Sequence, residues 1–129
     1  MSSQNTSDKL DLIFEKQEEL ARNFQPQELK NGFYTHPCLD LESPQDQMIL
    51  KAYAWFTVEE IAEAMNELRN RPWKTTMKPV DVPHFKEELV DALHFFVELL
   101  QHAGMTADDV YIEYMKKASI NQKRIDTGV

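Results

Sequence analysis

Two pairs of carboxylates at helical spacing are the residues of this chain best suited to chemistry. One pair is Glu60 and Glu63, in the stretch EEIAE, and the other is Glu88 and Asp91, in EELVD. Residues three apart lie on the same side of a helix, so each pair presents two carboxylates together. If the two pairs face each other they repel one another without a cation, and such hard oxygen ligands suit Mg²⁺ or Mn²⁺. The spacing therefore predicts a metal site, with two solvated acidic helix faces as the alternative.

The two segments that carry these pairs share one layout. Shifting the first by 28 residues onto the second superimposes apolar positions as well as acidic ones, Ile61 on Leu89 and Met65 on Leu93. At about 100° per residue the carboxylates lie away from that apolar stripe. The acidic sectors nevertheless carry Phe56 and Phe95, which is unusual for faces that meet only water. We therefore expect the apolar stripes to form the core and the acidic sectors to form a second contact surface.

A polar stripe near the end of the chain is the next candidate. Lys117, Asn121 and Arg124 follow a spacing of four and three residues, so two cations and an amide lie on one side of a helix. Such a group is suited to binding phosphate, and Lys74 is a further cation for the same role. The alternative is an ordinary basic helix end that complements the helix dipole.

Gln17 lies on an apolar stripe, between Phe14 and Ala21. A bare amide there is costly unless it is hydrogen-bonded, so Gln17 either reads a ligand or bonds a neighbouring backbone group. Trp73 follows a proline and is expected to plug the core rather than to stack on a ligand. His94 has two interpretations, a ligand-binding group or a satisfied helix histidine.

Four helices that position these residues are predicted from caps and periodicity. They span about residues 8–24, 44–70, 83–104 and 106–125, and residues 25–42, with Pro26, Gly32 and Pro37, read as a loop. Ser43 before Pro44, and Thr106 before Asp109, are typical helix starts. With no alternating segment long enough for a strand, we expect an all-α bundle of four to five helices. Residues 1–129 read as one domain, with 1–7 flexible.

The composition restricts the partners. The chain has 129 residues, 42% of them hydrophobic, and 22 acidic against 14 basic residues give a formal net charge of -8. Free nucleic acid and anionic membranes are therefore poor partners. The single cysteine, Cys38, provides neither an internal disulfide nor a thiolate cluster. No signal peptide or membrane-spanning stretch is present in the sequence, so a cytoplasmic protein is expected.

These motifs together resemble the all-α nucleoside triphosphate pyrophosphatases, the MazG-like superfamily, and within it the dimeric-type dUTPases. The similar segments are FEKQEEL with Gln17, then EIAE, WK, EELVDALHF and the tail KASINQKRIDTG, in the order that family shows. These segments extend over nearly the whole chain. In its short length the chain resembles the compact viral or phage members of the family.

The resemblance implies Mg²⁺-dependent hydrolysis, with Mn²⁺ as a substitute, of a deoxynucleoside triphosphate to the monophosphate and pyrophosphate. The substrate it favours is dUTP, with dCTP as a second one. It implies that the metal is held by Glu60, Glu63, Glu88 and Asp91, and that Glu63 or Glu60 acts on the attacking water. It further implies that the phosphates contact Lys117, Asn121, Arg124 and Lys74, and that base and sugar contact Gln17, Trp73, His94 and Phe95.

Departures from the family pattern leave other functions open. In the tail, Ile125 and Val129 stand where the family has a glutamine and an aromatic residue, so another (d)NTP such as dGTP, or a non-standard nucleotide, is an alternative substrate. A non-enzymatic helical interaction module is the second alternative. Two helices that are apolar on two sides cannot bury every stripe in so short a chain, so a homodimer or a dimer of dimers is expected.

Overall fold

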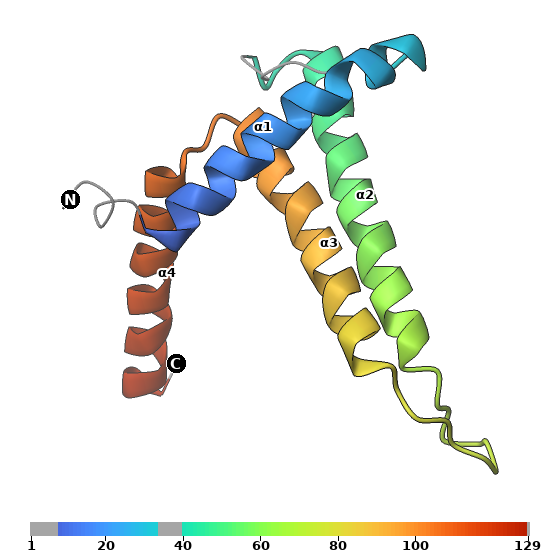
Figure 1. Cartoon of the computed structure of the whole chain (residues 1–129). Coiled ribbons are helices and arrows are strands. Elements are labelled where there is room, and N and C mark those ends of the chain that lie inside the picture. The colour runs from blue at the N-terminus through green and yellow to red at the C-terminus, as the bar shows by residue number, and fades with distance from the viewer. Residues whose placement is uncertain (1–7, 34–39, 129) are drawn as a thin grey trace, which may run out of the picture.

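A computed structural model describes residues 8–33 and 40–128 of the chain. In those ranges it contains α1 (Lys9–Lys30), α2 (Pro44–Glu67), α3 (Val82–His102) and α4 (Ala107–Thr127), with no strand (Figure 1). The predicted all-α class is therefore confirmed. The expectation of a flexible start concerns residues 1–7, which lie outside the described ranges. None of the described helices is both long enough and apolar enough to cross a membrane.

The helices start where the sequence predicts because polar side chains satisfy their free backbone N–H groups. The hydroxyl of Ser43 accepts from the backbone of Asp46, and Asp81 does the same for His84 at the start of α3. At α4 the side chain of Thr106 accepts from the backbone of Asp109, whose carboxylate accepts from the Thr106 backbone in return. Such reciprocal capping fixes the first turn of a helix.

The predicted end of the first helix at Phe24 is wrong. The helix continues through Pro26 to Lys30, although a proline removes one N–H donor and its ring crowds the preceding turn. The stop signal is Gly32, which has a φ of 83° and places the N–H of Phe33 2.8 Å from the carbonyl of Glu28. This is the left-handed glycine end common to helices. The extra turns bring Glu28 and Phe33 against α2, as described below.

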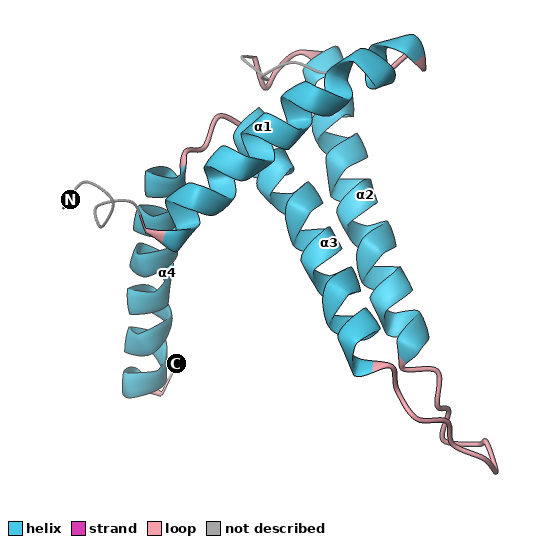
Figure 2. Cartoon of the chain, viewed as in Figure 1, coloured by secondary structure: helices cyan, strands magenta, loops and turns pink. Residues whose placement is uncertain are grey.

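Helices α2 and α3 lie side by side and run in opposite directions, joined by a loop of residues 68–81 (Figure 1). Helix α1 crosses the end of this pair, and among the described helices the backbone of α4 comes close to that of α1 alone. Figure 2 shows the loop 68–81 extending beyond the ends of α2 and α3, and α4 diverging from α3. Helices α2 and α3 thus carry all four predicted metal ligands, and α3 also carries His94 and Phe95.

The buried core is small and has two parts. One joins α1, α3 and α4 through Phe14, Val97 and Ala107. The other is centred on Ile49 and Tyr53 of α2, where the ring of Tyr53 meets that of Phe56 at 5.5 Å. Both parts lie near the end of the α2–α3 pair that α1 crosses, so the rest of α2 and α3 is held chiefly by their mutual contact.

The apolar stripes expected to form the core of α2 and α3 lie outside it in the single chain. Ile61 and Met65 are 42% and 45% exposed, and Leu93 is 45% exposed. The two helices instead pack through their acidic sectors, where Ala64 and Ala92 are 0% and 6% exposed. These small side chains allow close approach of the two helices. The prediction of the core face was wrong, and that of a second contact surface was right.

Candidate functional site

The acidic sectors of α2 and α3 bring carboxylates together. One oxygen of each of Glu60, Glu88 and Asp91 lies within 4.8 Å of the others, and all three side chains are partly buried. Glu60 comes from α2, whereas Glu88 and Asp91 lie one turn apart on α3. This acidic cluster, Glu60 with Glu88 and Asp91, exists because the two helices share the 28-residue repeat seen in the sequence.

The electrostatics of the acidic cluster favour a cation. Burial, followed by the neighbouring carboxylate of Glu63 and then by Glu88 and Asp91, raises the pKa of Glu60 to about 7. Burial and Glu63 also raise the pKa of Glu88, although the imidazole of His84 opposes that rise. Oε2 of Glu88 is buried and accepts no hydrogen bond from residues 8–33 or 40–128. Crowded carboxylates with an unused acceptor are the donor set that Mg²⁺ and Mn²⁺ prefer.

Glu63 lies at the open edge of the acidic cluster. Its side chain is exposed, yet it lies within interaction range of both Glu60 and Glu88, since it contributes to the raised pKa of each. Of the four predicted metal ligands, three converge and Glu63 borders them on the solvent side. Glu63 therefore differs from the other three carboxylates in its exposure to solvent.

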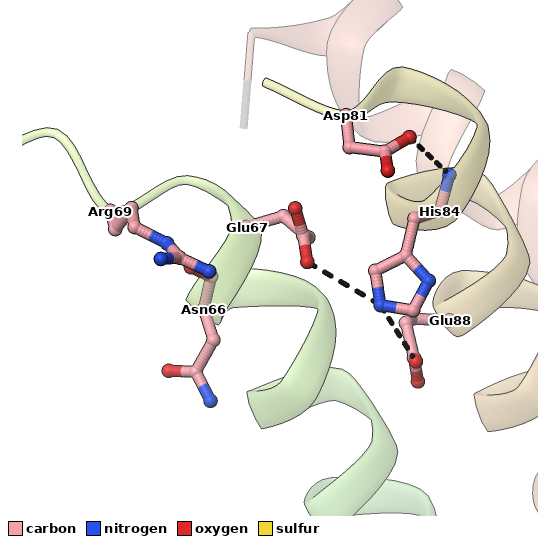
Figure 3. Close-up of polar contacts among 6 residues, drawn as sticks. All are labelled: Asn66, Glu67, Arg69, Asp81, His84 and Glu88. Atoms are coloured by element: carbon pink, nitrogen blue, oxygen red, sulfur yellow. Dashed lines mark hydrogen bonds and ion pairs between the residues drawn. The ribbon is translucent and has the colours of Figure 1, made fainter. Parts of the chain in front are cut away.

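His84 joins the two helices beside the acidic cluster, a role that the sequence did not reveal. Its Nε2 lies 3.4 Å from Oε2 of Glu67 on α2 and 3.3 Å from Oε1 of Glu88 on α3 (Figure 3). Asp81 caps the same helix end by accepting from the His84 backbone at 3.2 Å. The available signal was the four-residue spacing between His84 and Glu88. Glu67 is therefore paired with His84 instead of standing free at the surface.

A cavity of about 740 Å³ opens beside the acidic cluster, between α1 and the α2–α3 pair. Glu60 and Asp91 line it together with the aromatic rings of Phe33, Phe56 and Phe95. The rings of Phe56 and Phe95 lie 5.5 Å apart, one from each helix. A cleft of this size with a charged end and apolar walls is typical of a small-molecule site.

Gln17 belongs to the polar part of this cavity and is itself buried, with 6% exposure. Its Nε2 donates to Oε1 of Glu98 at 3.0 Å, and its Oε1 lies 2.7 Å from Nδ1 of His94. Because an amide oxygen only accepts, Nδ1 of His94 is the donor. The alternative in which Gln17 bonds a neighbouring backbone group is therefore wrong, since both partners are side chains of α3.

A second buried network, which sequence reasoning missed, extends from Glu98. Nε2 of His102 lies 3.4 Å from Oε2 of Glu98, and the His102 ring lies 4.7 Å from the ring of Tyr53. The hydroxyl of Tyr53 donates to Oε2 of Glu28 at 3.3 Å. Burial, then the carboxylates of Glu98 and Glu28, raise the pKa of Tyr53, so its hydroxyl stays a donor. The signal in the sequence was again a four-residue spacing, from Glu98 to His102.

The remaining predicted residues are not brought to the acidic cluster in the single chain. Lys74 and Trp73 lie in the loop 68–81, where Trp73 is 77% exposed, so its expected core position is wrong. The three predicted phosphate ligands of the tail are exposed on α4, whose backbone comes close to that of α1 alone among the described helices. These residues are Lys117, Asn121 and Arg124.

Comparison with known proteins bears on one stretch of the chain. A family model described as dUTPase matches residues 9–100, from the start of α1 to the last turn of α3. No curated protein and no solved structure matches the chain. The matched range includes the acidic cluster, its neighbour Glu63 and the cavity, whereas α4 lies beyond it.

Proposed function

The chain belongs to the dUTPase family, and from this premise we propose that it hydrolyses dUTP, with dCTP as a second substrate, to the monophosphate and pyrophosphate with Mg²⁺. Family and fold make it a dUTPase-like nucleotide pyrophosphatase. One observation supports the proposal above all others. Glu60 and Asp91 belong both to the acidic cluster and to the wall of the aromatic cavity, so a nucleotide base in the cavity places its phosphates beside the carboxylates.

The donor set fits a divalent cation. Glu60, Glu88 and Asp91 would hold Mg²⁺, or Mn²⁺ in its place, and the unused buried oxygen of Glu88 gives the clearest reason. A cation held by these residues would supply positive charge against the triphosphate and would make a nearby water more acidic. The chain's own contribution is to fix the three carboxylates on two rigid helices. His84 adds to this by tying Glu88 to Glu67 across them.

Glu63 is the carboxylate placed to act on the attacking water. It is exposed at the open edge of the acidic cluster and does not belong to the three that converge, so its oxygens remain available to accept a proton. Glu60 is the second candidate, because it lies beside Glu63 and lines the cavity. Glu63 at the edge of the acidic cluster would thus be the general base, and the carboxylates within the cluster would be the metal ligands.

The cavity offers a pyrimidine the contacts it needs. Phe95 and Phe56 provide aromatic walls for the base or the sugar. Gln17, held by Glu98 and His94, retains one N–H donor and one carbonyl lone pair. That pair of groups complements the O4 and N3–H of uracil, and equally the N3 and N4–H of cytosine. These groups can therefore pair with either pyrimidine, and they leave the choice between dUTP and dCTP to direct measurement.

The test is pyrophosphate release from a panel of nucleotides. We expect turnover of dUTP, and weaker turnover of dCTP, with Mg²⁺ or Mn²⁺ and none with EDTA. Glu60→Gln is expected to abolish turnover, whereas Glu59→Gln, a change of the neighbouring exposed residue, retains it. Faster turnover of dGTP or of a non-standard nucleotide than of dUTP would identify that nucleotide as the substrate instead. No turnover of any nucleotide by the folded protein would leave a helical interaction module instead.

A further inference from the structure

Glu98 is a buried carboxylate in the wall of the cavity, and it lies outside the acidic cluster. The residue is 7% exposed and stands on α3 about two turns beyond Asp91. Its Oε1 accepts from Nε2 of Gln17 at 3.0 Å, and its Oε2 lies 3.4 Å from Nε2 of His102. A carboxylate is costly to bury even when it is paired. Its place beside the cavity therefore needs an explanation beyond packing.

The Gln17 amide has two possible orientations, related by a half-turn that exchanges its oxygen and its NH₂ group. In the structure the NH₂ group faces Glu98, and the oxygen lies 2.7 Å from Nδ1 of His94. The reversed amide would place its oxygen against a carboxylate oxygen, and both of these atoms only accept hydrogen bonds. His94 can adapt to a reversal by changing its tautomer, because an imidazole nitrogen either donates or accepts. Glu98 is therefore the residue that decides the orientation of the amide.

His102 holds the second oxygen of Glu98. It stands one turn further along α3, and its imidazole ring lies 4.7 Å from the ring of Tyr53. Tyr53 is 1% exposed and belongs to the core cluster on α2, so the imidazole is packed against a fixed partner. The carboxylate of Glu98 is thus held between Gln17 and a residue that the core supports. Such connected polar networks restrict their members to one arrangement.

The orientation of the Gln17 amide determines which pyrimidine it matches. Uracil presents an acceptor at O4 beside a donor at N3–H, whereas cytosine presents a donor at N4–H beside an acceptor at N3. A base confined between the sugar and the aromatic walls of Phe56 and Phe95 meets one fixed donor and one fixed acceptor. Only one of the two patterns then pairs, and the other sets donor against donor and acceptor against acceptor.

We infer that Glu98, held by His102, is a positioning residue that makes the site prefer uracil to cytosine, because it fixes the order in which the Gln17 amide presents its donor and its acceptor. The inference rests on the proposed function for the identity of the ligand. Glu98 acts through Gln17 and belongs to none of the carboxylates that converge near Asp91. Its replacement should therefore change which base is accepted and leave the reaction at the phosphates unchanged.

Glu98→Gln tests the inference, because a glutamine has nearly the same shape and its amide either donates or accepts. The Gln17 amide can then turn over. The ratio of kcat/KM for dUTP to that for dCTP should fall by about tenfold, with a higher KM for dUTP, a lower KM for dCTP and nearly constant kcat. Glu113→Gln, the same change at an exposed position on α4, should keep the wild-type ratio. An unchanged ratio in Glu98→Gln, or an equal loss for both nucleotides, would indicate a merely structural role and overturn the inference.

His102→Phe is a second variant, in which the carboxylate itself is kept. The new ring can still pack against Tyr53, but it has no nitrogen to contact Glu98. The ratio should therefore fall in the same direction as in Glu98→Gln and by a smaller factor. Combined with Glu98→Gln, this change should add almost nothing, because both act through the orientation of one amide. A wild-type ratio in His102→Phe would overturn the inference even if Glu98→Gln did not fold.

Binding of the monophosphates measures base selection without turnover. Calorimetric titration with dUMP and dCMP in the presence of Mg²⁺ should give the lower Kd for dUMP in the wild type, and a smaller difference between the two in Glu98→Gln. The rise in melting temperature with Mg²⁺ should persist in the variant, since the acidic cluster is intact. A wild type that prefers dUMP but hydrolyses no triphosphate would refute the proposed function alone. An active wild type whose preference survives in Glu98→Gln and His102→Phe would refute this inference alone.

Discussion

Oε1 of Gln17 lies 2.7 Å from Nδ1 of His94, a residue 77 positions further along the chain. The bond ties α1 to α3 at the wall of the cavity, and the Gln17 amide is fixed on its other side by Glu98 at 3.0 Å. Gln17 is thus held in one orientation before any ligand enters. A preorganised amide of this kind reads a ligand at a small entropic cost.

Replacement of Gln17 is therefore expected to weaken both substrate binding and the fold. Gln17→Ala leaves Glu98 and His94 without their shared partner, which should lower the free energy of unfolding by about 1–3 kcal/mol. The KM for dUTP should rise more than kcat falls, because on the proposed function the amide contacts the base and not the reacting phosphate. Urea unfolding and steady-state kinetics measure the two effects. Gln45→Ala, at an exposed position outside the cavity, is the control; an unchanged KM in Gln17→Ala would contradict base contact.

Metal binding should appear as thermal stabilisation. We expect the melting temperature of the wild-type protein to rise with Mg²⁺ or Mn²⁺, since a ligand at 100 times its Kd adds about 2.7 kcal/mol to the folded state. Asp91→Asn removes one carboxylate of the acidic cluster and should abolish the rise. Asp108→Asn changes an exposed residue of α4 and should leave it intact. Equal stabilisation of wild type and Asp91→Asn would place the cation elsewhere.

The sequence predicted the acidic cluster but not its surroundings, and the reason is the range of the interactions. Glu60, Glu88 and Asp91 follow from local helical spacing and from a repeat visible along the chain. The hydrogen-bond partners of Gln17, His94 and Glu98, are 77 and 81 residues away. No local pattern around Gln17 identifies either of these partners. Only the crossing of α1 over α3 brings these side chains together.

The prediction of which face of α2 and α3 forms the core was wrong for a different reason. Periodicity shows that a stripe is apolar, but it cannot tell packing within a chain from packing between chains. The period of Met65 and Leu93 predicts a core position, yet both lie on the outside of the helix pair. The end of α1 differs from the prediction because the helix accommodates Pro26, and Gly32, with its left-handed φ, follows its last turn.

His84 is expected to position Glu88. Its Nε2 bridges Glu67 and Glu88 at 3.4 and 3.3 Å, so His84→Ala frees the Glu88 carboxylate from α2. Removing such a supporting contact typically weakens metal affinity by about 10–100-fold. Titration of Mg²⁺ by calorimetry measures this, and Glu67→Gln should produce a loss in the same direction. Additive losses in the double variant would contradict a shared bridge.

The raised pKa of Glu60 predicts how the metal-free protein responds to pH. A carboxyl with a folded-state pKa of about 7 against an ordinary 4.5 binds its proton more tightly when folded. This contribution to stability is therefore fully present below about pH 4.5 and is lost as pH rises through about 7. Glu60→Gln cannot ionise, so in EDTA it should be more stable than wild type at pH 8 and nearly equal to it at pH 5. Urea unfolding at the two pH values measures the difference, with Glu59→Gln as control. If wild type and Glu60→Gln lose the same stability between pH 5 and pH 8, Glu60 is already charged at pH 5. That result would contradict strong repulsion between the carboxylates of the acidic cluster.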